Sequence, residues 1–185
     1  MREGRAELTR LVVIRLLSPT TRVYSCHMAE DADAVVLQYL ENIKGKRVSS
    51  AWLALNSFVV DVEWETGQKK ELYFWFEPTW HISCATGVIL GSRQAQVEDK
   101  EAHAQLGKIA AQLDGHQIES ADLDTITHDI QLRFSGGYWL RTVVSDPADE
   151  EIWYIRDNSK GVVAGASPKG YFVRTVEQFV PPDKK

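Results

Sequence analysis

The side chains of this sequence that are best suited to chemistry are carboxylates, and they gather in two short stretches. Asp122, Asp124 and Asp129 surround a predicted turn. Alternating carboxylates can bind calcium, but a calcium loop supplies about six or more oxygens in a tight arc, which this stretch lacks. We expect instead an acidic surface that binds a basic protein. Its predicted members are Glu119, Asp122, Asp124 and Asp129 in one patch, with Asp146, Asp149, Glu150 and Glu151 in a second.

The common sequence motifs for catalysis and for tight metal binding are absent. The chain lacks the GxGxxG and P-loop phosphate patterns, the GxSxG nucleophile elbow, HExxH and any CxxC pair. His81 and Cys84 have an HxxC spacing, but a zinc site needs about three or four ligands. An enzyme that uses His81 or His128 with a nearby Asp is ranked last, because the two halves of the chain share no acid–base pair. We predict no catalysis, no cofactor and no metal.

The tryptophans form the second group of informative residues, and there are six of them. Aromatic side chains dominate the energetics of cores, so we expect most of them to pack between two sheets. We expect Trp75 and Trp139 to be the more exposed ones. An alternative function follows from the same residues: a small-ligand carrier whose cavity is lined by Trp75, Trp80 and Trp139. An adaptor or assembly subunit is a further alternative.

Composition narrows the class of protein. The chain has 185 residues, of which 44% are apolar and 25% charged, as in an ordinary globular domain. No run approaches 18 apolar residues, which predicts a protein that does not span a membrane. Two cysteines suit a reducing compartment, so we expect a cytoplasmic protein. The formal net charge of −5 argues against nonspecific nucleic-acid binding.

The charge is distributed unevenly along the chain. Residues 1–27 carry five arginines against two glutamates, a net charge of +3, and the remaining residues carry −8. An acidic stretch that looks like a natural chain start begins at Met28. We therefore predict that residues 1–27 are a basic extension outside the functional domain. Residues 28–174 are predicted to form one compact domain, and residues 175–185 a tail.

An internal repeat organises the predicted domain. Residues 45–67 align without a gap with residues 115–137, so that Gly45 matches Gly115. Within the match, apolar positions alternate with polar ones, which is typical of a strand with one buried face. The preceding residues of each copy have the spacing of an amphipathic helix, beginning near Asp31 and Asp99. The matched strand positions are Val60 with Ile130, Val62 with Leu132 and Trp64 with Phe134.

Each repeat is thus one helix followed by about five short strands, and the two repeats span residues 28–93 and 94–174. Packing the copies together would bury the apolar face of each sheet. The predicted fold is α+β, an internally duplicated unit with largely antiparallel strands in two packed sheets that have pseudo-two-fold symmetry. The oligomeric state does not follow from these patterns.

The repeated pattern resembles small bacterial immunity proteins that accompany polymorphic toxins of the contact-dependent inhibition or type VI kind. The resemblance covers roughly residues 45–165, and most of its positions are core and turn residues. It implies noncatalytic binding of a cognate toxin domain inside the producing cell. The residues that carry it are Gly45-Lys46-Arg47-Val48, Glu63-Trp64 and Trp80-His81-Ile82, and then Leu113-Asp114-Gly115, Ile130, Leu132, Phe134, Gly137 and Trp153.

Overall fold

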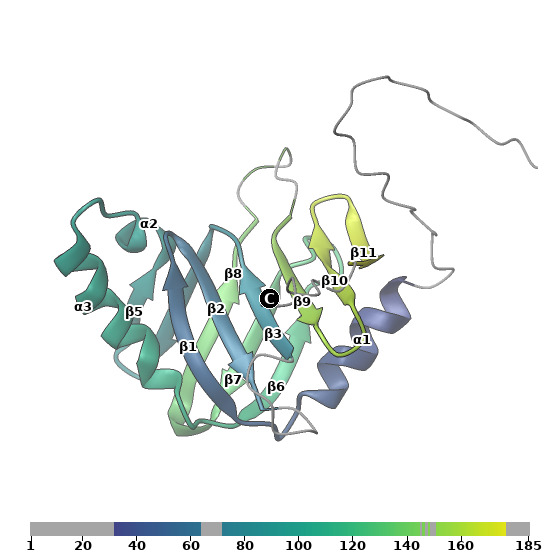
Figure 1. The fold of residues 1–185 in the computed structure, drawn as a ribbon, viewed down its shortest axis with the longest axis horizontal. Helices are drawn as coiled ribbons and strands as arrows, with labels where there is room; N and C mark the ends of the chain where they lie inside the picture. The colour runs from purple at the N-terminus through teal and green to yellow at the C-terminus, as the bar shows by residue number, and fades with distance from the viewer. Residues whose placement is uncertain (1–31, 64–71, 145, 147, 149–150, 177–185) are drawn as a thin grey trace, which may run out of the picture.

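The computed structural model has the predicted α+β fold, and its described residues form three α-helices and two antiparallel sheets (Figure 1). Among the described residues, no helix is both long and apolar enough to cross a membrane. The predicted basic extension, nearly all of the predicted tail and Trp64 lie outside the described residues. The residues that the structure describes are 32–63, 72–144, 146, 148 and 151–176.

The two long helices lie where the sequence predicts them. Helix α1 spans Ala32–Asn42 and α3 spans Lys100–Ala110, with the short α2 (Ser92–Ala95) before α3. Asp99 caps α3, because its carboxylate accepts a hydrogen bond from the Ala102 backbone N–H at 2.7 Å. Short 3₁₀ turns span Ala111–Leu113 (η1) and Ser135–Gly137 (η2).

The strands form a six-stranded sheet in the order β1-β2-β3-β9-β10-β11 and a five-stranded sheet in the order β5-β4-β8-β7-β6. All neighbouring strands are antiparallel. The larger sheet contains β1 (Val48–Ala54), β2 (Ser57–Val62), β3 (Leu72–Phe76), β9 (Trp153–Asp157), β10 (Val162–Ser167) and β11 (Gly170–Thr175). The smaller contains β4 (Trp80–Cys84), β5 (Gly87–Gly91), β6 (Ile118–Leu123), β7 (Ile130–Phe134) and β8 (Tyr138–Thr142).

Neither sheet is built from one half of the sequence. The first half supplies β1, β2 and β3 to the larger sheet, and β4 and β5 to the smaller one. The second half supplies β6, β7 and β8 to the smaller sheet, and β9, β10 and β11 to the larger one. Phe76 opposes Trp153 where β3 meets β9, and Thr142 opposes Trp80 where β8 meets β4. Each half therefore completes the sheet of the other, an exchange that the repeat alone did not predict.

The halves also meet at a junction just before β1 and β6. The backbone N–H groups of Gly45 and Gly115 each donate to a carbonyl in the opposite half, over 2.7 and 2.9 Å. Both glycines have a positive φ, +80° and +79°, a conformation that costs glycine little. An isolated bridge joins Arg47 to Gln117 between them. These contacts recur at the spacing of the sequence repeat, while an origin by duplication stays a prediction.

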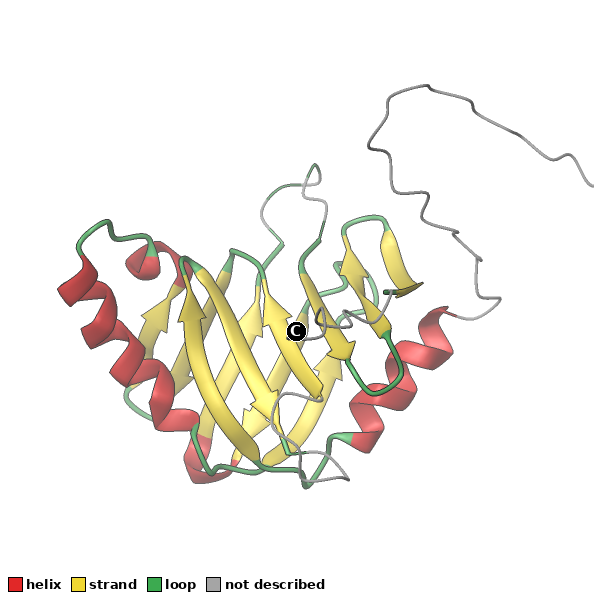
Figure 2. Cartoon of the chain, viewed as in Figure 1, coloured by secondary structure: helices red, strands yellow, loops and turns green. Residues whose placement is uncertain are grey.

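Trp80 and Trp153 anchor the core between the two sheets, where they are 2% and 0% exposed. Each indole N–H donates to a backbone carbonyl at 2.9 Å, that of Asn56 for Trp80 and that of His128 for Trp153. Each bond ties the core to the turn that follows the first strand of a half. Helix α3 contacts β1 and β5, which are edge strands of the two sheets. Helix α1 contacts β10 and β11 at the other edge of the larger sheet, so the two helices lie at opposite edges of the stacked sheets (Figure 2).

Gly165 of β10 has no room for a side chain. A Cβ atom there would lie 2.4 Å from the Trp153 carbonyl oxygen and 2.6 Å from the Tyr154 Cβ. Gly91 of β5 occupies the corresponding place in the smaller sheet, where a Cβ would lie 3.5 Å from the Trp80 carbonyl oxygen. The larger sheet therefore has the tighter contact at this point.

We predict that Gly165→Ala lowers the free energy of unfolding by roughly 1–3 kcal/mol, because the added methyl group overpacks β9 against β10. Gly107 in α3 has no atom within 4 Å of an added Cβ, so Gly107→Ala is the matched control. Alanine favours a helix, and this control should gain roughly 0.5–1 kcal/mol. Urea denaturation measures both changes. A Gly165→Ala variant as stable as the wild type would contradict the prediction.

Candidate functional site

The first predicted acidic patch lies on β6 and on the turn that follows it. Asp122 is exposed, and its carboxylate accepts a hydrogen bond from the Ser120 hydroxyl at 2.9 Å. Asp124 is exposed as well, and accepts from the backbone N–H groups of Thr127 and Ile126. These bonds lower the pKa of Asp124, so it is charged at neutral pH.

Glu119 differs from these two carboxylates because it already has a cationic partner. The Arg133 guanidinium lies 3.0 Å from its carboxylate, and both side chains are about half exposed. An exposed ion pair of this kind contributes little to stability, so another charged group can replace the arginine at small cost. Within the described residues, neither Asp122 nor Asp124 forms an ion pair.

Asp129 does not belong to the exposed patch, contrary to the prediction. It is 8% exposed, and its carboxylate accepts hydrogen bonds from the Thr142 hydroxyl, the Val144 backbone N–H and the Thr127 hydroxyl, at 2.8 to 2.9 Å. A buried carboxylate with three donors is already satisfied by its own chain. Asp129 therefore fixes the β6–β7 turn to the end of β8.

The second predicted patch is only partly described. Asp146 is exposed and accepts a hydrogen bond from the Ala148 backbone N–H at 2.8 Å. Glu151 is half-buried and forms an ion pair with Arg174 at 2.7 Å. Asp149 and Glu150 lie outside the described residues.

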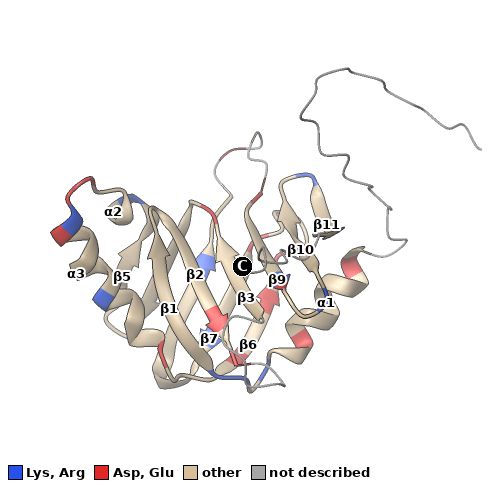
Figure 3. Cartoon of the chain, in the orientation of Figure 1, with Lys and Arg blue, Asp and Glu red and all other residues tan. Residues whose placement is uncertain are grey.

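The outer face of the larger sheet carries a line of aromatic side chains that the sequence did not predict as a unit. Six cross-strand neighbours form one row, with one residue from each strand. We call it the aromatic row: Trp52, Val59, Trp75, Tyr154, Gly165 and Phe172. Strands β1, β3 and β10 contain no charged residue and are tan along their lengths in Figure 3.

The rings of the aromatic row pack on one another. Trp75 stacks parallel to Tyr154 with ring centroids 6.0 Å apart, and meets Trp52 edge-to-face at 6.2 Å. Val59 lies between the two tryptophans in the row and is 0% exposed, although it is not part of the core between the sheets. Trp52 itself is 37% exposed. The row is thus a packed apolar platform on the outside of the sheet.

Carboxylates bind the indole nitrogens of this platform. The Trp75 N–H donates to Glu77 at 2.8 Å, and the Trp52 N–H donates to Asp61 at 3.2 Å. The second carboxylate oxygen of Glu77 accepts from the Ser57 hydroxyl at 2.7 Å. These bonds fix the indole rings with their polar edges satisfied and their faces apolar.

The outer face of the smaller sheet has a different chemistry at the corresponding places. Its row of cross-strand neighbours consists of Asp122, Gln131, Arg141, His81 and Gly91, which we call the polar row. Burial, followed by the nearby Arg141 cation, lowers the pKa of His81, so this imidazole is neutral at pH 7.

The three tryptophans predicted to line one cavity do not lie together. Trp80 is in the core. Trp75 belongs to the outer face of the larger sheet, whereas Trp139 lies on the outer face of the smaller one, where the Arg133 guanidinium sits 5.3 Å from its ring centroid. Trp75 and Trp139 are both half-buried. The aromatic-lined cavity proposed from the sequence is therefore wrong in its lining.

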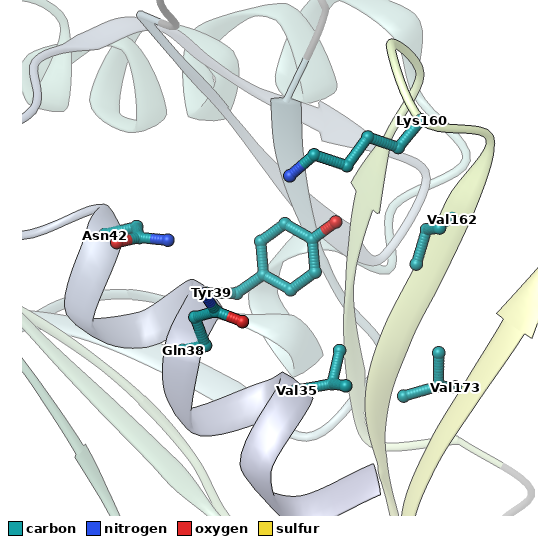
Figure 4. Close-up of a pocket in the computed structure, with 7 residues that line it drawn as sticks. All are labelled: Val35, Gln38, Tyr39, Asn42, Lys160, Val162 and Val173. Carbon is teal, nitrogen blue, oxygen red and sulfur yellow. The ribbon is translucent and has the colours of Figure 1, made fainter. Parts of the chain in front are cut away.

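A pocket of about 300 Å³ lies elsewhere, between α1 and the β10–β11 hairpin (Figure 4). The ammonium of Lys160 lies over the Tyr39 ring, 5.2 Å from its centroid. Valines line the strand side, and amide groups of α1 line the helix side. Such a lining suits a small ligand with an apolar body and an anionic group. The lining residues are Val35, Gln38, Tyr39, Asn42, Lys160, Val162 and Val173.

Asp157 holds the base of this pocket together. It is 0% exposed and accepts hydrogen bonds from the Tyr39 hydroxyl at 3.0 Å and the Ser159 hydroxyl at 2.6 Å, while the Lys160 ammonium lies at 3.3 Å. Burial opposes ionisation most strongly, but the hydrogen bonds from Ser159, Tyr39 and Lys160 outweigh it and lower the pKa of Asp157. Burial and the bond to Asp157 raise the pKa of Tyr39, so the phenol stays a donor.

We predict that Asp157→Asn lowers the free energy of unfolding by roughly 1–3 kcal/mol at pH 7, because charged hydrogen bonds are lost in a buried site. The native pKa of Asp157 lies below the unfolded one. Its stabilising contribution is therefore complete above about pH 4 and is lost as pH falls through the native pKa. The difference between wild type and variant, measured by denaturation across pH, should shrink in acid.

Tyr39→Phe is the matched control for this prediction. It removes one donor to Asp157 and leaves the charge, so it should cost roughly 1 kcal/mol and keep most of the acid dependence. If Asp157→Asn shows the same acid dependence as the wild type, the assignment of this titration to Asp157 is wrong.

Other chemically capable groups in the described residues remain isolated. No set of three or more His, Cys, Asp and Glu side chains in this part of the chain is placed to hold a metal ion. Cys84 is a free thiol that lies 3.1 Å from the Thr86 hydroxyl, and this contact lowers its pKa. The His128 ring packs edge-on against Tyr171 at 5.0 Å, and the buried His128 Nδ1 and Tyr171 hydroxyl have no hydrogen-bond partner.

Comparisons with known proteins give no indication of function, so the candidate sites are the surfaces and the pocket described above. No protein-family model, no curated protein and no solved structure matches the chain.

Proposed function

We propose that this chain is a noncatalytic protein-binding module that acts in the cytoplasm on a basic partner. The resemblance to immunity proteins gives the proposal its finer form, in which the partner is a toxin domain whose action the module blocks. A nuclease toxin would be basic, because its active site must attract phosphate. A complementary charge on the module would speed association and discriminate among partners.

One observation carries the proposal: Asp122 and Asp124 are exposed on adjoining segments and form no ion pair among the described residues. The pKa of Asp124 is lowered by backbone hydrogen bonds, which keeps its charge present at any neutral pH. Residues 28–185 carry a net charge of −8, so these carboxylates belong to an acidic domain. The Arg141 cation acts on Asp124 from farther away and is the smallest of the effects on its pKa. A carboxylate that is not in a close ion pair keeps much of its long-range field, which steers an incoming cation.

The pocket beside Lys160 favours a second candidate function, a small-ligand carrier. Its volume of about 300 Å³ lies at the low end of the usual range for ligand sites. Native mass spectrometry after gentle purification separates the two functions. A retained small-molecule mass that is lost in Lys160→Met would support the carrier.

We predict that the double variant Asp122→Lys, Asp124→Lys slows association with the basic protein that co-purifies from native cells by roughly tenfold at low salt. The association rate of the variant should also depend less on salt, because the steering field is weaker. Stopped-flow mixing across salt concentrations measures both effects.

Glu98→Lys is the control, because Glu98 is an exposed carboxylate in the segment between α2 and α3. It changes the net charge in the same direction but away from the patch. Equal slowing in Glu98→Lys, scaled for charge, would mean that net charge rather than the patch governs association. Unchanged association in the double variant would reject the patch.

A further inference from the structure

The outer faces of the two sheets have the same strand arrangement over five strands and can be compared residue by residue. Trp52 and Asp122 occupy corresponding places in the two rows, as do Trp75 and Arg141, and Gly165 and Gly91. The backbone at these places has the same strand pairing, yet one row is aromatic and the other is charged or polar. The fold therefore does not require aromatic residues on an outer face. Their presence on the larger sheet needs another explanation.

An interface supplies that explanation. Tryptophan, tyrosine and arginine are enriched at the centres of protein interfaces. Trp52, at one end of the row, is 37% exposed, and Trp75, Tyr154 and Phe172 are half-buried. Trp75 and Tyr154 are already packed in parallel, so little side-chain entropy remains to be lost when a partner binds. A rigid aromatic pair is a suitable anchor for this reason.

Burial, followed by the nearby Tyr73, Glu77 and Glu151, raises the pKa of Tyr154, and the Arg156 cation lowers it. Carboxylates therefore outnumber cations around the pair, which favours a cationic occupant.

The Glu77 carboxylate binds the Trp75 N–H, and Asp61 binds the Trp52 N–H, so an anion lies at the edge of each indole. Donation of an N–H to a carboxylate makes the indole face more electron-rich, which strengthens its attraction for a cation. The ring face and the carboxylate together suit a planar guanidinium, which stacks and forms charged hydrogen bonds at once.

The same row already contains one contact of this kind. The Arg174 guanidinium lies 5.1 Å from the ring centroid of Phe172 and forms an ion pair with Glu151. This arginine is held by one ring and one carboxylate at the edge of the row. Trp75 with Glu77 repeats the combination near its centre.

We propose that the aromatic row is the docking surface for a basic segment of a protein partner, whose arginine side chain stacks on Trp75 and Tyr154 beside Glu77. This inference rests on the proposed function for the basic character of the partner. It places the stacked contact on the outer face of the larger sheet, whereas Asp122 and Asp124, on the smaller sheet and its turn, attract the partner over a longer range. Arginine binds better than lysine at this site, because the ammonium of lysine cannot stack.

An acetylated tetra-arginine amide is the probe, with tetra-lysine as its counterpart, titrated into the full chain. Two-dimensional NMR follows the indole N–H signals. Tetra-arginine should shift the signal of Trp75, leave that of Trp80 unchanged, and bind about threefold or more tightly than tetra-lysine. Trp75→Leu should weaken binding by roughly fivefold.

Glu77→Gln keeps the test valid if Trp75→Leu is poorly folded. The glutamine oxygen can accept from the Trp75 N–H as the carboxylate does, and its amide N–H can donate to the Ser57 hydroxyl in place of the bond that Ser57 donates to Glu77. Both contacts are then kept while the charge is removed. Binding of tetra-arginine should weaken by about threefold or more. Glu98→Gln removes the same charge at a distance from the row and should leave the affinity almost unchanged.

Three results would overturn the inference. Tetra-lysine could bind as tightly as tetra-arginine, or Glu77→Gln could behave like Glu98→Gln. Sedimentation could also show a dimer that dissociates in Trp75→Leu, which would assign the row to a second copy of the chain. The co-purified partner separates this inference from the proposed function. If Asp122→Lys, Asp124→Lys slows its association while Glu77→Gln binds it normally, the proposed function stands and the docking surface is wrong.

Discussion

The architecture depends on two strand pairs, β3 with β9 and β4 with β8, through which the halves of the chain complete each other's sheets. Backbone hydrogen bonds cross both seams. Trp80 and Trp153, the most deeply buried tryptophans of the described residues, start the strands that cross over. The aromatic row also crosses a seam, because Trp75 comes from the first half and Tyr154 from the second. The stacked pair proposed as an anchor therefore exists only after the exchange has taken place.

Local patterns predicted the elements well because each is recorded in consecutive residues. The alternation around Val60 and Ile130 indicated strands, and Asp99 marked the start of α3, where its carboxylate does cap the helix. The exchange of strands was not predicted, since it is a choice among partners distant in sequence and alternation is the same for each. The sequence identifies which face of a strand is apolar, but not which strand lies beside it.

In the candidate site too, features set by neighbouring residues were predicted, and contacts between distant segments were not. Asp122 and Asp124 were correctly placed on the surface, but Asp129 is buried, because carboxylate spacing does not reveal which side chain meets Thr142 across a turn. Trp75 was predicted to be exposed but is half-buried, because it packs against Tyr154 and Trp52 on the outer face. Tyr154 and Phe172 were missed because cross-strand register brings them into the row. The Tyr39–Asp157 contact was missed for a similar reason, since it joins a helix to a distant strand end.

The strand exchange also determines the order in which the protein can fold during synthesis. A ribosome releases β1, β2 and β3 early, but β3 must wait with one edge unpaired until β9 has been made. Until then the β3 edge, which carries Phe74, Trp75 and Phe76, has no β9 to pair with, and an unpaired apolar strand edge favours aggregation. Pairings between such distant segments raise the contact order, and closing them is slow. Neither sheet can therefore be completed until the strands of the second half have been made.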